Sequence, residues 1–147
     1  MPRFKFRLAA ALRLARRALE EQQRRLALEL ENLHTLQTRC RYQEKTWQLA
    51  LEGQKEAGKS SPQDLGLWQN YAYKQFELLR RAERETYQQE QVVLEQRKIL
   101  LEAHQDVEKL KKLKEKQKAQ YDLVEQRREQ GILDEAGQVI FGRRNFE

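Results

Sequence analysis

The chain has 147 residues, 35% of them charged, with a mean hydropathy of −0.99 and only 6 Gly and 2 Pro. This length allows one domain at most, and a chain so poor in apolar residues has no shielded interior for an active site, so no enzyme is expected. Its composition fits either a disordered chain or a long coiled coil. One cysteine, Cys40, excludes an intramolecular disulfide, and no apolar run approaches the roughly 20 residues that span a bilayer.

Positive charge gathers at the start of the chain. Six basic residues and no acidic residue fall within positions 1–19, which equals the whole net charge of +6. A basic, acid-free start is also typical of mitochondrial transit peptides, but those are rich in Ser, and this segment has neither Ser nor Thr. We therefore expect a basic surface for an acidic protein partner.

Glycine and proline divide the chain once before residue 130. Gly53, Gly58, Pro62 and Gly66 lie close together, and residues 3–52 and 67–130 on either side contain neither residue type. Because these residues interrupt regular structure, the chain is predicted to be all-α, a long antiparallel two-helix coiled-coil hairpin with an overhanging second helix. We expect one domain over 1–147, with helices at about 3–52 and 62–130, a turn at 53–61, and a tail at 131–147 that is a short helical turn or a flexible end.

The ends of the second helix carry their own signals. Ser61 is expected to cap its start, with Pro62 in the first turn and Asp64 completing a capping box. Gly131 is expected to end it, because glycine is the usual residue after a helix C-terminus.

A heptad spacing of apolar residues runs through both predicted helices. In the first helix it extends from Leu12 to Trp47, and in the second from Ala72 to Tyr121. Heptads that stay in one phase over this length indicate a coiled coil rather than a disordered chain. The residues expected in the seam are Leu12, Leu19, Leu26, Leu33, Leu36, Trp47, Trp68, Leu79, Val93, Leu100, Val107 and Leu110.

Folding the helices about the turn predicts their register. It places Trp47 beside Trp68 and Glu29 beside Thr86, and a slip of one heptad stays open. Since polar residues then fall in the middle of the seam, we expect the middle to be its softest part.

The second helix is predicted to be longer than the first and to overhang it from about Lys112 to Gln130. This stretch is rich in lysine, and Tyr121 and Val124 continue its apolar stripe. Because the chain offers that stripe no partner in the predicted fold, we expect another protein to cover it.

No catalytic, cofactor or metal site is expected. The letters GQKEAGKS, from Gly53 to Ser60, match a phosphate-binding loop, but that loop follows a buried strand, and here a charged helix is predicted before it. His34 and Cys40 fall on different helix faces with no further ligand near, which argues against a metal site. Nucleic acid binding is not expected either, because the leucine spacing runs through the basic start and commits it to packing.

Half of the twelve aromatic residues lie between Tyr42 and Phe76. The predicted hairpin brings them together near the turn, with Trp47 and Trp68 in the seam. The others cannot all face inward, and exposed aromatic side chains are typical of binding hot spots. The alternative is that they only brace the turn. The residues predicted to bind a partner there are Tyr42, Tyr71, Tyr73 and Phe76.

Short motifs in a fixed order resemble the flagellar export protein FliJ family. The letters FKFRL from Phe4 are similar to that family's opening, and LKEKQ from Leu113 is similar to part of its later helix. LDEAG from Leu133 resembles its ending, with Gly137 where alanine is usual. The similarity runs the length of the chain, and the order and spacing of the motifs carry it.

The resemblance implies a non-enzymatic component of the bacterial flagellar type III export apparatus, similar to the central stalk of rotary ATPases. In this family the joined helix ends insert into the ring of the export ATPase FliI, and the hairpin region contacts the export gate protein FlhA. The family also recycles substrate chaperones, and the ATPase regulator FliH is a further expected partner. The resemblance implies a monomer without cofactor, cytoplasmic and held peripherally at the inner face of the cell membrane through its partners.

By the same resemblance the aromatic residues named above would bind the gate. The residues implied to bind the ATPase are Arg3, Arg7, Arg13, Arg16, Arg17, Lys112, Lys116, Tyr121 and Val124. Two other interpretations stay open, namely the equivalent stalk of a virulence-type injectisome and a generic coiled-coil scaffold or tether. The identity of the neighbouring genes would distinguish a flagellar stalk from an injectisome stalk. Sedimentation would distinguish a stalk from a tether, because a tether is expected to be a stable parallel dimer.

Overall fold

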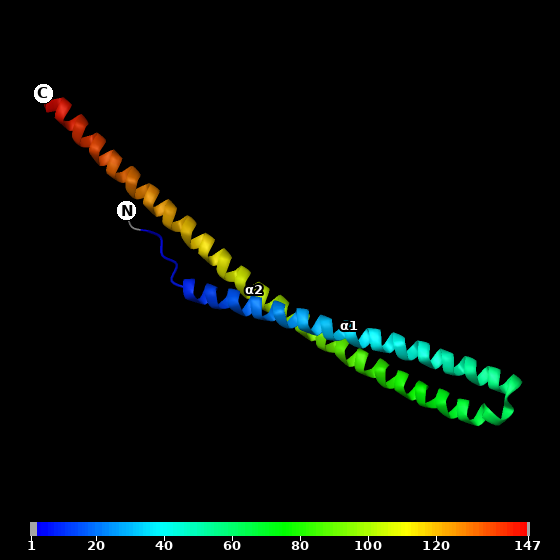
Figure 1. Ribbon diagram of the computed structural model, residues 1–147. Helices are drawn as coiled ribbons and strands as arrows, with labels where there is room; N and C mark the ends of the chain where they lie inside the picture. Colours follow the sequence, from blue (N-terminus) through cyan, green and yellow to red (C-terminus); the bar gives the residue numbers. More distant parts are fainter. Residues whose placement is uncertain (1–2, 147) are drawn as a thin grey trace. The chain divides into compact units, whose positions relative to one another are not determined.

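The computed structural model describes residues 3–146, and their side chains as far as residue 143. Two long helices, α1 (Ala9–Ser60) and α2 (Leu65–Phe146), are joined by a short 3-10 helix, η1 (Pro62–Asp64) (Figure 1). No strand occurs between residues 3 and 146. The prediction of an all-α, two-helix hairpin is confirmed. The chain divides into two compact units, a hairpin unit, Glu20–Glu102, and a terminal unit made of the residues up to Leu19 and those from Ala103 onward.

The two arms of the hairpin unit, cyan and green in Figure 1, run side by side in opposite directions. Their buried and half-buried residues recur with the spacing of a heptad, as a coiled-coil seam requires. Three of the most buried seam residues, Ala50, Ala72 and Ala82, are alanines. The seam of this unit is therefore narrow, because small side chains let two helices approach closely.

The residues predicted for the seam are covered to different degrees. Leu79 and Val93 are buried in the hairpin unit, and Leu12 and Val107 are buried in the terminal unit. Trp68 is 37% exposed. The half-buried members are Leu19, Leu26, Leu33, Leu36, Trp47, Leu100 and Leu110.

The turn is shorter than predicted and lies later in the chain. The expected break at 53–61 is wrong, because α1 continues through Gly53 and Gly58 as far as Ser60. Glycine in a helix costs only about 1 kcal/mol relative to alanine, and no described glycine has the positive φ that would end a helix. Ser61 makes no side-chain capping bond, so the predicted capping box is wrong. The chain instead reverses through η1, where the Asp64 amide donates to the Ser61 carbonyl oxygen at 2.9 Å.

The register differs from the first expectation, and Glu29 meets Gln89, three residues further along α2 than predicted. Glu29 was predicted opposite Thr86, but the Thr86 hydroxyl donates to the carbonyl oxygen of Leu36, seven residues further on, at 3.4 Å. Trp47 packs on Phe76, with ring centroids 5.4 Å apart. The offset from the predicted pairing is therefore three residues at Glu29 and seven at Thr86, so the slip of one heptad that the sequence left open does not describe the whole seam.

The polar residues in the middle of the hairpin seam bond to one another. The Gln89 side-chain amide donates to the Glu29 carbonyl oxygen at 3.0 Å. The Gln96 amide donates to Gln22 Oε1 at 2.6 Å, and Gln96 is only 9% exposed. Buried polar groups are costly only when left unpaired, so these layers are compatible with the seam. That the middle is the softest part stays a prediction.

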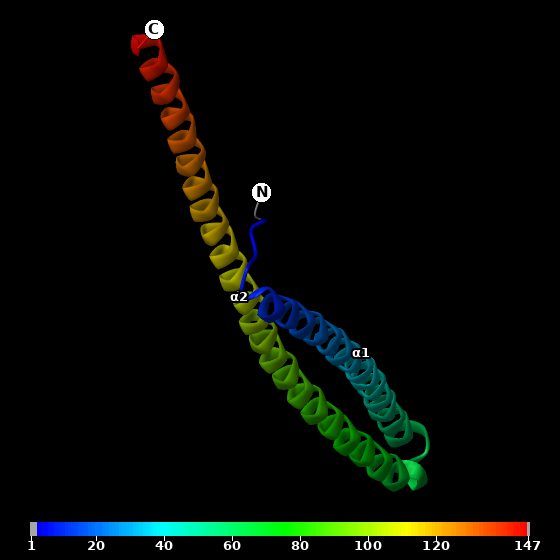
Figure 2. The same ribbon diagram turned by 90° about the vertical axis from the view of Figure 1, so that its left-hand side faces the viewer.

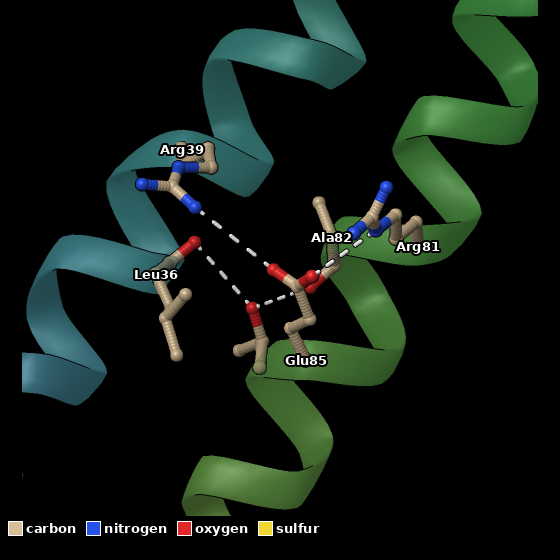
Figure 3. A network of polar contacts seen from close by, with 6 residues as sticks. Leu36, Arg39, Arg81, Ala82 and Glu85 are labelled. Carbon is tan, nitrogen blue, oxygen red and sulfur yellow. Dashed lines mark hydrogen bonds and ion pairs between the residues drawn. The ribbon is translucent and has the colours of Figure 1, made fainter.

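An exposed polar network lies beside the same seam (Figure 3). The Glu85 carboxylate on α2 forms an ion pair with Arg39 of α1 at 3.9 Å and another with Arg81 of its own helix at 3.3 Å. Both arginine side chains are well over half exposed. Such pairs typically contribute about 0–1 kcal/mol, so this network adds little to the stability of the hairpin unit.

The terminal unit begins with a non-helical segment. The first helix was predicted from residue 3, but α1 starts at Ala9, and the segment before it runs beside α2 (Figure 2). The helix dipole is positive at its N-terminus, so the arginines and lysine of this segment disfavour a helix there. The segment packs instead, since Phe6 forms a buried cluster with Leu12 and Val107, with Phe4 against it.

The last part of the terminal unit is helical throughout. The second helix was predicted to end near Gln130 with a C-cap at Gly131, followed by a tail that is a short helical turn or a flexible end. These predictions are wrong, because α2 continues to Phe146. A methyl group added at Gly131 or Gly137 would meet nothing within 4 Å. Large apolar side chains are 57–67% exposed there, namely Ile132, Leu133, Val139, Ile140 and Phe141. Among the described residues, no helix is apolar enough over a sufficient length to cross a membrane.

Candidate partner-binding surfaces

A groove on the hairpin unit combines aromatic rings with arginines. Phe76 rests on Trp47 on one side, and the Arg80 guanidinium carbon lies 5.2 Å from the Phe76 ring centroid. A cation over an aromatic face is attracted to it, so Arg80 is held in place at the rim. The groove has a volume of about 640 Å³ and is lined by Tyr73, Lys74, Phe76, Glu77, Leu78, Arg80, Arg81 and Arg84.

Tyr73 stands at one end of this groove and is 63% exposed. Its hydroxyl donates a hydrogen bond to the Glu77 carboxylate, one turn further along α2, and that bond, with the carboxylate's charge, raises the pKa of Tyr73 above its ordinary value. The phenol therefore stays neutral at any physiological pH. It offers a partner an apolar ring with a hydrogen-bonding tip, the type of side chain enriched at interfaces.

Arginines extend the groove in a way that the predicted site did not include. A second hollow of about 580 Å³ continues it and is lined by Arg80, Glu83, Arg84, Tyr87 and Gln88. The sequence signal was present, since Phe76, Arg80, Arg84 and Tyr87 follow one another at helical spacing. The prediction for this surface named only the aromatic residues and not the arginines between them.

The other predicted aromatic residues lie elsewhere. Tyr71 is 43% exposed and packs edge-on against Trp68, with ring centroids 5.9 Å apart. Tyr42, on α1, is 66% exposed and lines neither groove. The structure thus brings Tyr73 and Phe76 into one groove and leaves Tyr71 and Tyr42 outside it.

The basic residues predicted to bind the ATPase are exposed in the terminal unit. This holds for Arg3, Arg7, Arg13, Arg16 and Arg17 and for Lys112 and Lys116. Val124 is also exposed, at 60%. The terminal unit holds 16 Lys and Arg against 9 Asp and Glu, a net charge of +7, whereas the hairpin unit holds 13 against 14.

Tyr121 departs from the expectation for this surface. It was predicted to lie on an overhang with no partner in the chain, but it packs against Phe4, with ring centroids 5.6 Å apart. This cover, with the nearby carboxylates of Glu125 and Asp122, raises the pKa of Tyr121. The extended N-terminal segment therefore occupies part of the stripe that was expected to need another protein.

The motifs examined for chemistry lie in helices. Gly53, Gly58, Lys59 and Ser60 are all part of α1, so their amides bond within the helix and form no phosphate-binding loop. Within residues 3–146 no group of three metal-binding side chains comes together. Cys40 is half-buried, and burial with the carboxylates of Glu83 and Glu44 raises its pKa, which makes the thiol a poor nucleophile.

Comparison with known proteins decides the family. The family model described as flagellar FliJ protein matches residues 4–146, nearly the whole chain. The chain belongs to the flagellar FliJ family. No curated protein and no solved structure matches it. As a FliJ-family protein it is a non-enzymatic component of the flagellar protein export apparatus, and the grooves and the basic surface are its candidate contacts with the other components.

Proposed function

We propose that this FliJ-family protein is a stalk that couples the export ATPase FliI to the export gate protein FlhA, with the aromatic–arginine groove as the gate-binding surface. The observation that carries the proposal is that the exposed Tyr73 and Arg80 and the half-buried Phe76 line one groove. Tyrosine and arginine are enriched among residues that dominate binding energy. Because Phe76 is fixed against Trp47 and Arg80 against Phe76, little side-chain freedom is lost when a partner binds.

The terminal unit is proposed to bind the ATPase ring. Its net charge of +7 favours an acidic surface and speeds association with it. The exposed apolar residues of the last part of α2 supply contact area beside that charge. The ATPase regulator FliH and substrate chaperones are further proposed partners of this protein. The protein would act in the cytoplasm as a monomer, peripheral to the inner face of the membrane through the gate.

The gate contact is tested with the purified cytoplasmic part of FlhA and isothermal titration calorimetry. Tyr73→Ala removes an exposed ring without touching the seam, and it is expected to weaken binding about tenfold. Leu94→Ala, which removes a side chain 53% exposed on the same helix, is the matched control and should bind normally. Equal affinities for the two variants would remove the groove from the gate contact.

The ATPase contact is tested by stimulation of ATP hydrolysis by FliI. The double variant Arg13→Glu/Arg17→Glu reverses charge on the terminal unit and should abolish most of the stimulation, more strongly at low salt. Arg97→Glu/Lys98→Glu makes the same change of charge on the hairpin unit and should stimulate normally. If both variants stimulate ATP hydrolysis equally, the terminal unit is not the surface that binds the ATPase.

A tether that dimerises in parallel is the alternative of a different class. The hairpin seam is filled by residues of the same chain, which leaves no equivalent seam for a second copy in this unit. Sedimentation equilibrium is expected to give the mass of one chain over the micromolar range. A stable dimer would favour the tether.

A further inference from the structure

A third hollow, of about 440 Å³, lies at the turn end of the hairpin unit and is lined by Asp64, Leu67, Trp68 and Tyr71. Asp64, at the end of η1, lies three and four residues before Leu67 and Trp68, and Tyr71 lies four and three residues after them, so the four share one face where η1 passes into α2. Three of these side chains remain accessible to solvent, since Trp68 is 37%, Tyr71 43% and Leu67 71% exposed. None of the four lines the aromatic–arginine groove.

The walls of this hollow are fixed by contacts in the hairpin unit. A methyl group at Gly53 would lie only 2.3 Å from the six-membered ring of Trp68, so the indole lies directly on the α1 backbone, where only glycine leaves room. Tyr71 stands at 79° to the indole plane, with ring centroids 5.9 Å apart. The two rings therefore form a corner whose geometry is set before any ligand arrives.

The floor of the hollow carries a negative charge with no cation to balance it. Among the described residues, the Asp64 carboxylate makes no ion pair and no side-chain hydrogen bond, and only its backbone amide is engaged, by Ser61. Aromatic faces carry the negative part of the ring quadrupole and attract cations. Two aromatic rings, a carboxylate and a leucine thus select a ligand that is cationic, planar and attached to an apolar stem.

We propose that this hollow binds an arginine side chain of a protein partner. The guanidinium lies against the Trp68 and Tyr71 rings and donates N–H bonds to the Asp64 carboxylate, while Leu67 contacts the methylene stem. Arginine fits better than lysine, because its delocalised plane stacks on aromatic faces and forms two parallel bonds to a carboxylate. The proposal concerns a site separate from the groove assigned to the gate, and it holds whichever component supplies the arginine.

The test uses the full chain, labelled with ¹⁵N, and the indole N–H signals of its two tryptophans. N-acetyl-arginine amide is the probe, and N-acetyl-citrulline amide, which has the same shape without the charge, is its control at constant ionic strength. The Trp68 signal is expected to shift saturably with arginine, with a Kd of about 1–10 mM for so small a ligand. Trp47, packed on Phe76 in the seam, is the internal reference and should not move.

Variants then separate charge from shape. Asp64→Asn keeps the side chain's size and should weaken arginine binding roughly fivefold, whereas Glu56→Gln, an exposed carboxylate on α1, should leave it unchanged. Equal shifts with citrulline, no saturable shift of Trp68, or unchanged affinity in Asp64→Asn would each overturn the proposal. A Trp68 response to phosphatidylcholine vesicles with none to arginine would assign the hollow to a lipid headgroup and would overturn it as well.

Discussion

The hairpin unit and the terminal unit are built from the same two helices, yet different forces stabilise them. In the hairpin unit the seam holds alanines and hydrogen-bonded amides such as the Gln22–Gln96 pair. In the terminal unit a cluster of large apolar side chains, Phe6, Leu12 and Val107, gathers around a non-helical segment. Two complementary helices can rely on many small contacts, whereas a short segment that covers a helix needs a few large ones.

Charge separates the units in the same way. The hairpin unit is nearly neutral, and the terminal unit carries +7. A neutral unit can approach a partner through aromatic contacts with little dependence on salt, whereas a strongly basic unit is steered to its partner by long-range attraction. The comparison predicts that binding by the terminal unit is the more sensitive to ionic strength.

The largest expected effect is on the terminal cluster. Leu12 is 3% exposed there, and Leu12→Ala should cost about 3 kcal/mol through lost contacts and the cavity left behind. Hydrogen exchange of the amides of residues 12–19 reports this loss, with the hairpin amides as reference. Leu14→Ala, at a position 65% exposed, is the matched control and should change exchange by less than about 0.5 kcal/mol. If both variants exchange alike, the cluster does not hold this unit.

A smaller effect is expected where Trp68 crosses α1. Gly53→Ala gains about 1 kcal/mol in helix propensity but displaces the indole, which costs about 2 kcal/mol of buried contact. Urea unfolding should therefore show a net loss of about 1 kcal/mol. In a Trp68→Ala background the same substitution should become stabilising, as should Gly131→Ala in the terminal unit, where the added methyl group meets nothing. Stabilisation by Gly53→Ala in the natural background would contradict the close approach.

The polar layers of the hairpin seam should be replaceable. Gln22→Leu with Gln96→Leu exchanges a hydrogen-bonded pair for an apolar one and is expected to raise the free energy of unfolding by about 1 kcal/mol. Gln96→Leu alone should gain less, because it leaves the Gln22 amide without its partner. Urea unfolding followed by circular dichroism measures both. A double variant less stable than the natural chain would mean that these amides are needed in the seam.

The smallest effect concerns the contact between Phe4 and Tyr121. Phe4→Ala uncovers the phenol, so the raised pKa of Tyr121 should fall toward 10.0. A raised folded-state pKa favours the neutral phenol, so its contribution is fully present below pH 10 and is lost as the pH rises through the folded-state value. NMR titration of the tyrosine rings measures this, with Tyr73 as a reference that should not change. Phe4→Leu should retain part of the shift.

Much of the fold could be predicted from residue spacing. Apart from Trp68, the residues predicted for the seam are buried or half-buried, because the period of a helix fixes which residues share a face. The end of α1 could not be predicted in this way. Whether Gly53 breaks a helix or lies inside it depends on Trp68, fifteen residues further on, which fills the space that the missing side chain leaves.

The candidate site was predicted only in part. Exposed aromatic residues near the turn were expected, and Tyr73 and Phe76 do share a groove. Arg80 was missed, since its placement over Phe76 depends on the Trp47 contact from the other arm. Local spacing names the side chains on a face, but it does not say which of them a neighbouring helix will hold in place.

By itself, the sequence determined that this protein is a charged, two-helix chain with a basic beginning, because helical periodicity and composition are local properties. Only the tertiary structure decided the register, the non-helical segment at Phe4 and Phe6, and the continuous helix through Gly53. Each of these depends on a balance between a local cost of about 1 kcal/mol and contacts made far along the chain. Such contacts exist only once the two helices have met.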